Sequence, residues 1–501
     1  MATSFGIHVG NTSACLAVSK EGKTDVVAAP TGDRVTPAVV SYTDTEVIVG
    51  LPAKQGRVRN MANTVVNNKR LLVGRASPEE LATGPVTVVE EDGQHFYMVD
   101  FKEEEFKTSP SEVLTHIYAY LHSIAASHCR EVEDCHCVLT APLDYSTEER
   151  ALLARLATAV GFKVVQVVSE PAAACLAYGL GQLDQGDTEH VLVYRAGGLS
   201  TDLALVLVAG GVYSVLESVA MDDLGGHQVT EVLVKFLAGE FKAKYHEDIL
   251  QSKKGRAKLA GQAETVKQVL STLDTAHCYV ESLYDGMDFS SNVTRARFDN
   301  QLAPVLSELM APVSVLLTRA GLAAEDIDKV VVVGGTGKVV KLQRTLDNLF
   351  PEAEVLSTIA PDEVLAYGAA VQAGLVTNTA TAAPREKMMA TSQDITARVV
   401  GAGEEEEEVD VIVASTPLPV KRSVPVVRTG ASTTVEVVWG EETVLASLVL
   451  ETSAASKLVL SVHIHRDGST TCALQDKAPG GGATSMVLSP AAPASTLDIE
   501  I

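Results

Sequence analysis

Along the first three quarters of the chain, segments with the apolar spacing of strands alternate with segments that have the apolar spacing of helices. Short apolar runs typical of strands are separated by stretches with apolar residues at helical spacing, which is the pattern of an α/β architecture. The expected strands are Phe5–Val9, Val26–Ala28, Val35–Tyr42, His136–Thr140, Val164–Val168, Val191–Tyr194, Leu203–Val208 and Lys329–Val333. The expected helices are Thr147–Val160, Ala172–Tyr178, Gln228–Phe241 and Val339–Leu349. The pattern therefore predicts an α/β domain over residues 1–380.

The pattern changes after residue 380. We expect residues 381–408 to form a linker that includes the acidic run Glu404–Glu408. From residue 409 onward the apolar segments alternate as strands do, and Pro, Gly and Ser separate them. The expected strands are Val409–Val413, Thr434–Val438, Thr443–Leu450 and Leu458–His465. Residues 409–501 are therefore predicted to be a small all-β domain.

The α/β part contains an internal repeat. Residues 5–18 and 191–206 each have the pattern of a strand, a small polar turn and a second strand, and a glycine hairpin follows each. Small residues let the backbone approach closely, and successive N–H groups in such turns bind anions. Two facing copies would hold a polyphosphate. A third glycine pair, Gly334 and Gly335, ends an apolar strand before a helix and suits a nucleoside.

Two other phosphate-binding motifs are absent from the sequence. The pair Gly337-Lys338 is followed by Val339, whereas a P-loop requires Ser or Thr there, and Val332 stands where the first P-loop glycine would be. No G-x-G-x-x-G opens a helix after a strand, because Gly179-Leu-Gly181 lacks the third glycine. The repeated turns are therefore the candidate phosphate site.

Composition narrows the possible partners. Lys plus Arg number 40 and Asp plus Glu number 64, so the net charge is −24 and the surface repels a phosphate backbone. We expect no direct, non-specific nucleic-acid binding, and on charge alone the basic pair Lys69-Arg70 is expected to be a solvated surface. The sequence shows no signal peptide and no apolar window of about 18 residues. A soluble, cytoplasmic protein without membrane contact is therefore expected.

The cysteines indicate a reducing compartment. The seven cysteines are odd in number and scattered along the chain, which fits reduced thiols better than a disulfide framework. His128, Cys129 and residues 135–137 form the one cluster of soft metal ligands. However, residues 135–142 have the pattern of a buried strand, which places Cys135 and Cys137 on the face opposite His136. We therefore expect no metal site.

Motifs in a fixed order reveal a family resemblance. Besides the two turns, they are Asp33–Ala38, Asn63–Val65, Lys69–Leu71, Ser169–Ala174, Ala177–Gly179, Leu224–Gly226, Glu281–Gly286, Thr294–Phe298 and Pro361–Ala370. The set resembles the nucleotide-binding domain of the seventy-kilodalton heat-shock chaperone family over about residues 5–376. Within that family it is most similar to the short, atypical member of the ribosome-associated complex, which works with a zuotin-type J-domain protein. The resemblance implies a two-lobed, actin-like (ribonuclease-H-like) ATPase domain followed by a small β-sandwich-like domain.

The resemblance also implies roles for individual residues. The residues that would line the phosphates are Gly10, Asn11, Thr12, Gly197, Gly198 and Ser200. The residues that would hold the adenosine of ATP are Glu264, Lys267 and Ser271. On the other side of the adenosine would lie Gly334, Gly335, Lys338 and Asp362. Lys69 and Glu170 would face the terminal phosphate, and Asp202 would face the water shell of a metal. These last three are the candidate catalytic residues.

Four substitutions separate the chain from the family pattern at these turns. His8 and Arg195 stand where the family has aspartates, Leu199 replaces a glycine, and Asn11 replaces a threonine. Hard Mg²⁺ prefers oxygen ligands, and phosphoryl transfer needs a cation at the phosphates. Arg195 is predicted to be the charge partner of the phosphates in place of magnesium. We therefore expect ATP binding with weak or absent hydrolysis, and leave the use of Mg²⁺ open.

The segments after the ATPase domain differ from the family as well. Lys387–Ile395 lacks the acidic, leucine-rich run of the family's interdomain linker. Ser415–Arg422 resembles one segment of the family's β-sandwich, and no helical lid precedes Ile501. We therefore expect a truncated β substrate-binding-like domain whose peptide site, if one exists, is open.

The functional expectation is an atypical chaperone or co-chaperone of the ribosome-associated complex. It would act with a zuotin-type J-domain protein, and reach ribosomes and nascent chains through that partner. The first alternative is an active, ATP-hydrolysing foldase, which the retained Lys69, Glu170 and Asp202 favour. A metabolite kinase of the same superfamily would need a catalytic aspartate in the cleft, and the sequence identifies none. An actin-like filament subunit is the last alternative.

Overall fold

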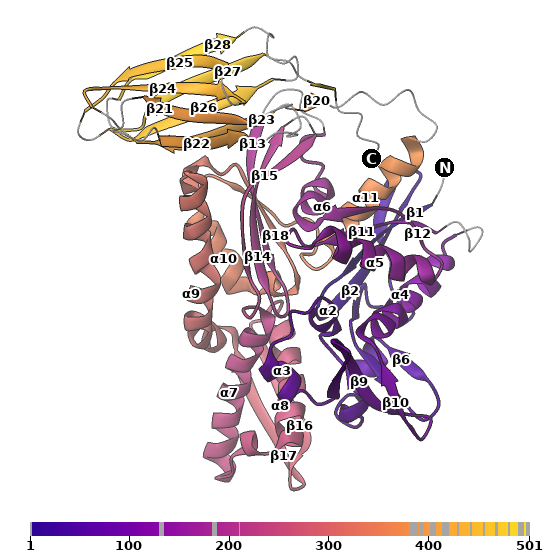
Figure 1. Ribbon diagram of the computed structural model, residues 1–501. Helices are drawn as coiled ribbons and strands as arrows, with labels where there is room; N and C mark the ends of the chain where they lie inside the picture. The colour runs from indigo at the N-terminus through magenta and orange to yellow at the C-terminus, as the bar shows by residue number, and fades with distance from the viewer. Residues whose placement is uncertain are drawn as a thin grey trace.

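The structure is a computed structural model, and it contains two parts (Figure 1). The α/β region is described over residues 3–129, 135–182, 188–209 and 211–379. The C-terminal β region is described over residues 394–400, 407–412, 420–427, 430–440, 443–453, 456–465, 469–478 and 481–488, and the short pairs 389–390 and 495–496 are also described. Most of the predicted linker and residues 413–419 of the predicted sandwich-like segment lie outside these ranges.

The first half of the α/β region is built on a mixed sheet. Its strands are β1 (Ser4–Val9), β2 (Ser13–Lys20), β3 (Lys23–Val26), β11 (His136–Ala141) and β12 (Lys163–Ser169), in the order β12-β11-β1-β2-β3. The strand β4 (Val35–Pro37) also pairs with β2. β1 runs antiparallel to β2 and parallel to β11. All six residues of β1 are buried, including the polar Ser4 and His8.

The second half repeats this topology. Its strands are β13 (Thr188–Ala196), β14 (Thr201–Ala209), β15 (Val212–Met221), β18 (Lys329–Val333) and β19 (Glu354–Leu356), in the order β15-β14-β13-β18-β19. β13 runs antiparallel to β14 and parallel to β18, as β1 does to β2 and β11. The repeat predicted from the two small polar turns is therefore present as two equivalent sheets.

Two helices, α6 (Glu170–Ala177) and α11 (Val364–Thr379), pack together between the sheets (Figure 1). Their contact requires glycine. A Cβ on Gly368 of α11 would overlap the carbonyl of Ala173 in α6, and one on Gly6 of β1 would overlap the backbone of Ala370. Close packing of this kind fixes the first sheet against the helices that lie beside the second sheet.

The remaining long helices cover the two sheets. α4 (Pro110–Ala126) and α5 (Thr147–Ala159) lie in the first half, and both begin at a capping box, formed by Ser109 with Glu112 and by Ser146 with Glu149. The second half contains α7 (Gly226–Tyr245), α8 (Lys253–Leu270), α9 (Arg295–Ala320), α10 (Val340–Leu349) and the hairpin β16 (Thr275–Tyr284) and β17 (Met287–Thr294). The four predicted helices correspond to α5, α6, α7 and α10.

Smaller elements complete the first half. They are the helices α1 (Leu51–Gly56), α2 (Asn68–Leu72) and α3 (Pro78–Thr83), and the strands β5 (Val40–Tyr42), β6 (Val47–Val49), β7 (Thr64–Val65), β8 (Thr87–Glu91), β9 (Gln94–Phe101) and β10 (Glu104–Thr108). Of these, α2 matters most for the site, because it carries Lys69 and Arg70.

The expectation that no apolar window reaches the length of a membrane span is wrong for α9. Within the described part of the chain, α9 is the one helix long and apolar enough to pass that test by length and composition. Its apolar residues Phe298, Leu302, Leu309 and Leu316 are buried in the hydrophobic core of the second half. Core packing therefore accounts for its composition.

The C-terminal β region consists of two four-stranded antiparallel sheets. One has the order β22 (Glu407–Ile412), β21 (Ile395–Val400), β24 (Ser432–Trp439), β25 (Thr443–Glu451), and the other β23 (Val420–Val426), β26 (Leu458–Ile464), β27 (Thr470–Asp476), β28 (Ala483–Leu488). Val435, Leu460 and Leu474 belong to a single core shared by the two sheets. A short pair, β20 (Met389–Ala390) with β29 (Ser495–Thr496), lies apart from them.

This region begins earlier in the chain than the sequence indicated. β21 lies inside the predicted linker 381–408, and it pairs with both β22 and β24. Ile395 and Ala397 belong to the core and Val399 is also buried, so a period-2 pattern was present but short. Glu407 and Glu408, the end of the acidic run, belong to β22. The linker is therefore shorter than predicted.

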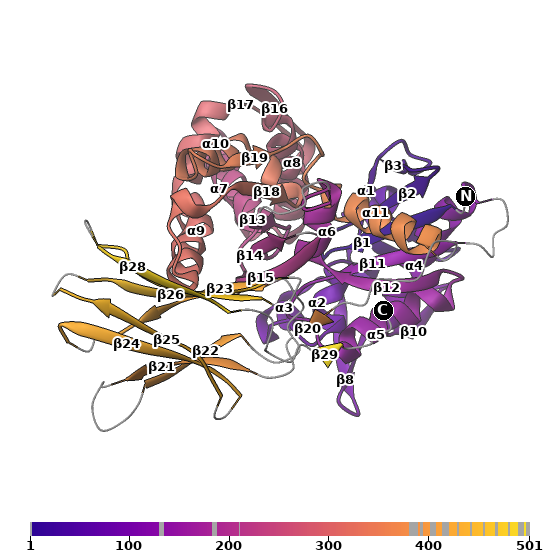
Figure 2. The same cartoon turned by 90° about the horizontal axis from the view of Figure 1, so that it is seen from above.

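The two regions are in contact (Figure 2). β23 is an edge strand of its sheet, and β15 is an edge strand of the second sheet of the α/β region. The guanidinium of Arg422 in β23 donates a hydrogen bond to the carbonyl of Val215 in β15, at 3.3 Å. The contact therefore joins an edge of the C-terminal β region to an edge of the α/β region.

Candidate functional site

The two predicted phosphate turns have the same backbone geometry. The amide of Gly10 donates to the carbonyl of Ser13 at 2.8 Å, and the amide of Gly197 donates to the carbonyl of Ser200 at 2.8 Å. The turns also face each other, because a Cβ on Gly198 would overlap the side chain of Thr12. The repeat therefore brings two equivalent loops, far apart in the sequence, into contact.

The third glycine pair joins the second of these turns. Gly334 follows β18 with a φ of 89°, and a Cβ at this position would overlap the carbonyl of Ala196. The hydroxyl of Thr336 donates to the carbonyl of Gly197 at 2.8 Å. The predicted nucleoside turn and the predicted phosphate turn are therefore a single backbone unit.

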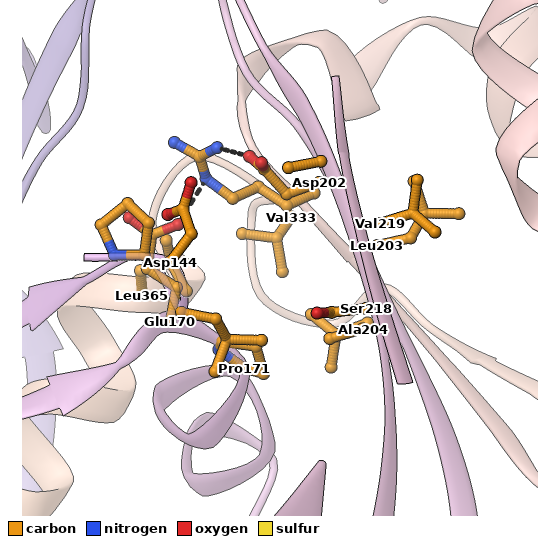
Figure 3. A pocket seen from close by; sticks show the side chains of 15 residues that line it. Asp144, Glu170, Pro171, Asp202, Leu203, Ala204, Ser218, Val219, Val333 and Leu365 are labelled. Carbon is orange, nitrogen blue, oxygen red and sulfur yellow. Dashed lines mark hydrogen bonds and ion pairs between the residues drawn. The ribbon is translucent and has the colours of Figure 1, made fainter. Parts of the chain in front are cut away.

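Arg195 holds two carboxylates at the second turn. Its Nε lies 2.7 Å from Glu170 Oε2, and its Nη1 pairs with Asp202 Oδ2 and donates to Ser200 Oγ at 3.2 Å. Asp202 is the direct cross-strand partner of Arg195 between β13 and β14, whereas Glu170 begins α6. Figure 3 shows the two carboxylates on either side of the guanidinium. Two predicted catalytic residues are thus already paired within the protein.

Burial makes this pairing strong. The side chains of Arg195 and Glu170 are 9% and 4% exposed. Burial opposes ionisation of both, but the charges of Glu170 and Asp202 raise the pKa of Arg195, and those of Arg195 and Lys69 lower the pKa of Glu170. The pKa of Asp202 is raised, because its burial outweighs the attraction of Arg195. Arg195 is therefore a fixed cation between two acids.

His8 is held in its neutral form. Its Nδ1 lies 2.8 Å from Thr140 Oγ1 and 3.8 Å from Glu170 Oε1. Burial lowers the pKa of His8 to about 3, and the nearby charge of Glu170 offsets this effect only in part. At neutral pH, His8 therefore adds no negative charge at the position where the family has a carboxylate.

Lys69 lies beside the first turn and is buried. Its ammonium donates to the carbonyl of Val9 at 2.7 Å and lies 5.1 Å from the centre of the Tyr145 ring. Burial lowers the pKa of Lys69 to about 8. Arg70, also buried, donates to the carbonyl of Asp222 at 3.1 Å and to Asp223 Oδ1 at 2.8 Å, so it connects α2 to the segment before α7. The expectation of a solvated basic pair is therefore wrong, because both cations have partners inside the fold.

A polar cavity lies among these groups. Its lining includes Asn11, Lys69, Arg70, Arg75, Tyr145, Asp144, Arg195, Ser200, Asp202 and Asp222. Its four cations, one amide and two hydroxyl groups are hydrogen-bond donors that suit an anion, and the cations outnumber the three carboxylates. A second, mainly apolar cavity adjoins it, and Glu170, Arg195 and Asp202 line that cavity too (Figure 3). The terminal phosphate predicted for this location would therefore lie among hydrogen-bond donors.

The predicted adenosine residues form their own cluster on α8. The ammonium of Lys267 is 2.6 Å from Glu264 Oε2 and donates to Thr230 Oγ1 at 2.9 Å and to the carbonyl of Gly226 at 3.1 Å. Burial raises the pKa of Glu264, but the charge of Lys267 reverses this effect, so the net pKa is lowered. Ser271 donates to the carbonyl of Lys267 at 3.1 Å and so belongs to the same helix end.

Lys338 and Asp362 form an ion pair of 2.6 Å on the other side. Gly335 precedes Lys338 in the same single helical turn, so the residues predicted to close the nucleoside site are adjacent. Among the described residues, Asp362 Oδ1 and Glu170 Oε1 are buried acceptors with no hydrogen-bond partner. Buried acceptors without partners are costly, and a ligand with hydroxyl groups or ordered water would relieve that cost.

The site fits a nucleotide, but it does not fit Mg²⁺. A triphosphate would meet the paired turns, Lys69 and the polar cavity, and its nucleoside would meet the Glu264 and Lys338 clusters. A magnesium ion would need carboxylate oxygens, but one oxygen of Glu170, Oε2, and one of Asp202, Oδ2, are paired with Arg195. A divalent cation at those oxygens would also lie next to the guanidinium, which repels it.

Sequence reasoning missed Thr140 and Tyr145, which contact His8 and Lys69, because neither belongs to a glycine motif. The sequence analysis assigned Asp202 to the water shell of a metal. Asp202 lies directly opposite Arg195 in the β13–β14 hairpin, and this spacing could have indicated that the two side chains pair.

Comparison with known proteins identifies the family. The profile of the family described as "Hsp70 protein" matches residues 4–447. The chain belongs to the Hsp70 family. It is similar to human Heat shock 70 kDa protein 14, with 38% identity over 429 residues, 83% of each chain. Heat shock 70 kDa protein 14 of Xenopus tropicalis is 36% identical over 498 residues, which is 95% of this chain and 97% of that protein. Heat shock 70 kDa protein 14-B of Xenopus laevis is 41% identical over 378 residues, 74% of each chain.

These findings confirm the resemblance seen in the motifs. The protein is an Hsp70-family chaperone with a mixed α/β fold, and membership of the Hsp70 family implies ATP binding. The roles of the individual site residues, and the use of Mg²⁺, stay predictions.

Proposed function

We propose that this Hsp70-family protein binds ATP but hydrolyses it weakly or not at all. It would act as the regulatory partner of a zuotin-type J-domain protein. In this proposal it belongs to a cytosolic ribosome-associated complex and assists nascent polypeptides through that partner. The α/β region is the two-lobed, actin-like nucleotide-binding domain, and the C-terminal β region is a substrate-binding-like domain. The observation that carries the proposal is the pairing of Arg195 with both Glu170 and Asp202.

The pairing separates binding from cleavage. Phosphoryl transfer depends on a cation that neutralises the phosphates and on a group that orients the attacking water. Here Arg195 supplies a cation at the second turn, and its bonds occupy one oxygen of each carboxylate that would otherwise serve a metal or a water. Neutral His8 offers no replacement carboxylate. Lys69 and the paired turns can still hold the phosphates in position.

A triple substitution tests the catalytic part of the proposal. His8→Asp, Arg195→Asp and Leu199→Gly together restore the family residue at three of the four substituted positions, beside the retained Lys69 and Glu170. A positioned water-orienting group contributes about 10²–10⁴ in rate. We expect single-turnover ATP hydrolysis to rise by about that factor in the triple variant, and not in either single carboxylate variant. In His8→Asp the new carboxylate would pair with Arg195, and in Arg195→Asp the neutral His8 still stands where the family has a carboxylate.

The alternative is an active foldase, which the retained Lys69, buried beside the first turn, favours. The same assay distinguishes the two proposals. Wild-type protein that already hydrolyses ATP as fast as the triple variant would contradict the regulatory role and support the foldase.

A pull-down tests the partner. Full-length protein should recover a J-domain protein at low and high salt, and ribosomes at low salt only, since a surface of net charge −24 does not bind ribosomal RNA directly. Loss of the J-domain protein on truncation after Asn378 would place the docking surface on the C-terminal β region. Recovery of neither ribosomes nor a J-domain protein would contradict the proposed complex, and sedimentation of the protein with ATP would favour a filament instead.

A further inference from the structure

Two thiols outside the nucleotide site lie close together. The Sγ atoms of Cys129 and Cys135 are 3.1 Å apart, in the first half of the α/β region. Cys129 follows the end of α4, and Cys135 directly precedes β11. None of the comparisons or the proposed nucleotide chemistry assigns a role to this pair.

Backbone hydrogen bonds position both thiols. The amides of His128 and Cys129 donate to the carbonyls of Ala125 and Ala126, at 2.9 and 3.3 Å, so the chain still turns helically at Cys129. The carbonyl of Cys135 accepts from the amide of Lys163 at 2.9 Å, at the start of β12. The short distance between the sulfurs is therefore set by the end of α4 and the start of β11, an inner strand of the first sheet.

The pair combines one accessible and one buried thiol. Cys129 is partly exposed, whereas Cys135 and the other five cysteines are buried. Cys137, two residues along the same strand face, is fully buried, and burial raises the pKa of its thiol. A reagent that enters from solvent would therefore meet Cys129 first and find Cys135 directly behind it.

Metal binding does not account for the cluster. Over the residues that the structure describes, no group of three or more His, Cys, Asp or Glu side chains is arranged to hold a metal ion. Two sulfurs alone do not provide the four ligands of a structural zinc site.

We propose that Cys129 and Cys135 are a modification site that low-molecular-weight disulfides oxidise to an intramolecular disulfide. The Cys129 thiolate attacks one sulfur of the reagent, breaks its S–S bond and releases one small thiol. Cys135 then attacks Cys129 Sγ in the mixed disulfide and releases the second small thiol. Two protein thiols lose two protons and two electrons, and the reagent is reduced to two thiols.

The geometry favours the second step. A disulfide requires an S–S distance of about 2.05 Å, so the two sulfurs must approach by roughly 1 Å. This approach needs only small side-chain movements, because the backbone already holds the two residues together. The product would join the end of α4 to the start of β11, the strand that carries Thr140, the partner of His8.

The test is oxidation of the folded, full-length protein with oxidised glutathione, followed by denaturation, alkylation with N-ethylmaleimide and mass spectrometry. The reduced protein has seven thiols that can be alkylated. We expect two fewer alkylated thiols after oxidation, and a cross-linked peptide that contains Cys129 and Cys135. Retention of all seven, or a stable glutathione adduct on wild-type Cys129, would overturn the proposal.

Three variants make the test specific. Cys135→Ser should stop the reaction at a glutathione adduct on Cys129, and Cys129→Ser should leave all the remaining thiols unmodified by glutathione. Cys137→Ala is the matched control, because it removes the neighbouring buried thiol and should still form the disulfide. A cross-link between Cys129 and Cys137 in wild type, or loss of the Cys129–Cys135 cross-link in Cys137→Ala, would contradict the assignment. Cys129→Ser alters a partly exposed residue, so it keeps the proposal falsifiable even if a buried-site variant does not fold.

Discussion

Replacing Arg195 with methionine should destabilise the α/β region strongly. The substitution keeps much of the apolar stem but removes the cation from two carboxylates, and Glu170 is only 4% exposed. Breaking a buried ion pair by removal of one partner costs about 3–5 kcal/mol. Asp202 is 28% exposed and adds less, because solvent screens its charge. We therefore expect the free energy of unfolding of the α/β region to fall by about 3–5 kcal/mol.

The chain itself offers a way to assign this loss to one region. Its one tryptophan, Trp439, is buried in the core of the C-terminal β region, whereas all twelve tyrosines lie in the α/β region. Urea unfolding followed by tyrosine near-ultraviolet circular dichroism should therefore shift in Arg195→Met. Unfolding followed by tryptophan fluorescence should change little.

Magnesium and a surface control complete the experiment. With Arg195 absent, the freed oxygens of Glu170 and Asp202 resemble a divalent-cation site, so Mg²⁺ should stabilise the variant more than wild type. Arg256→Met breaks an exposed pair with Glu231 and should cost at most about 1 kcal/mol. A loss in Arg195→Met no greater than in Arg256→Met, or equal stabilisation of both proteins by Mg²⁺, would refute the reasoning.

Three other contacts lead to further predictions. The pKa of His8 is lowered in the folded protein, so on acidification the unfolded chain binds a proton first, and the free energy of unfolding should fall below pH 6.5, by about 2 kcal/mol at pH 5. In urea unfolding, His8→Gln should show a weaker dependence of this free energy on pH, and an unchanged dependence would contradict the prediction. Lys267→Ala removes the charge beside Glu264 and should weaken ATP binding at least tenfold by calorimetry, whereas unchanged affinity would place the nucleotide elsewhere. Arg422→Ala removes the contact with Val215 and should speed proteolysis between the two regions; an unaltered cleavage rate would show that other contacts hold them.

The repeated turns could be predicted from the sequence because their chemistry is local. A strand, a small polar turn and a second strand are contiguous, and Gly10 and Gly197 form the same hydrogen-bonded turn in the structure. The order of motifs then identified the Hsp70 family. The expected strands of the α/β region, apart from Val26–Ala28, and helices α5, α6, α7 and α10 were likewise contiguous patterns.

The pairing at the site could not be predicted in the same way. Glu170 and Arg195 lie on different elements, and only the packing of α6 against the second sheet brings them to 2.7 Å. The burial of Lys69 and Arg70 has the same origin, since their partners are the carbonyl of Val9 and the segment before α7. β21 escaped notice because its six residues follow a stretch without clear periodicity.

The most direct test of the central claim is the affinity for ATP, measured by calorimetry with Mg²⁺ and again with EDTA. If Arg195 provides the cation that other members obtain from magnesium, the two dissociation constants should agree within about tenfold, ~1.4 kcal/mol. A loss of affinity in EDTA greater than that factor would contradict the account, because it would show that the nucleotide depends on a metal despite the pairing of Arg195 with Glu170 and Asp202.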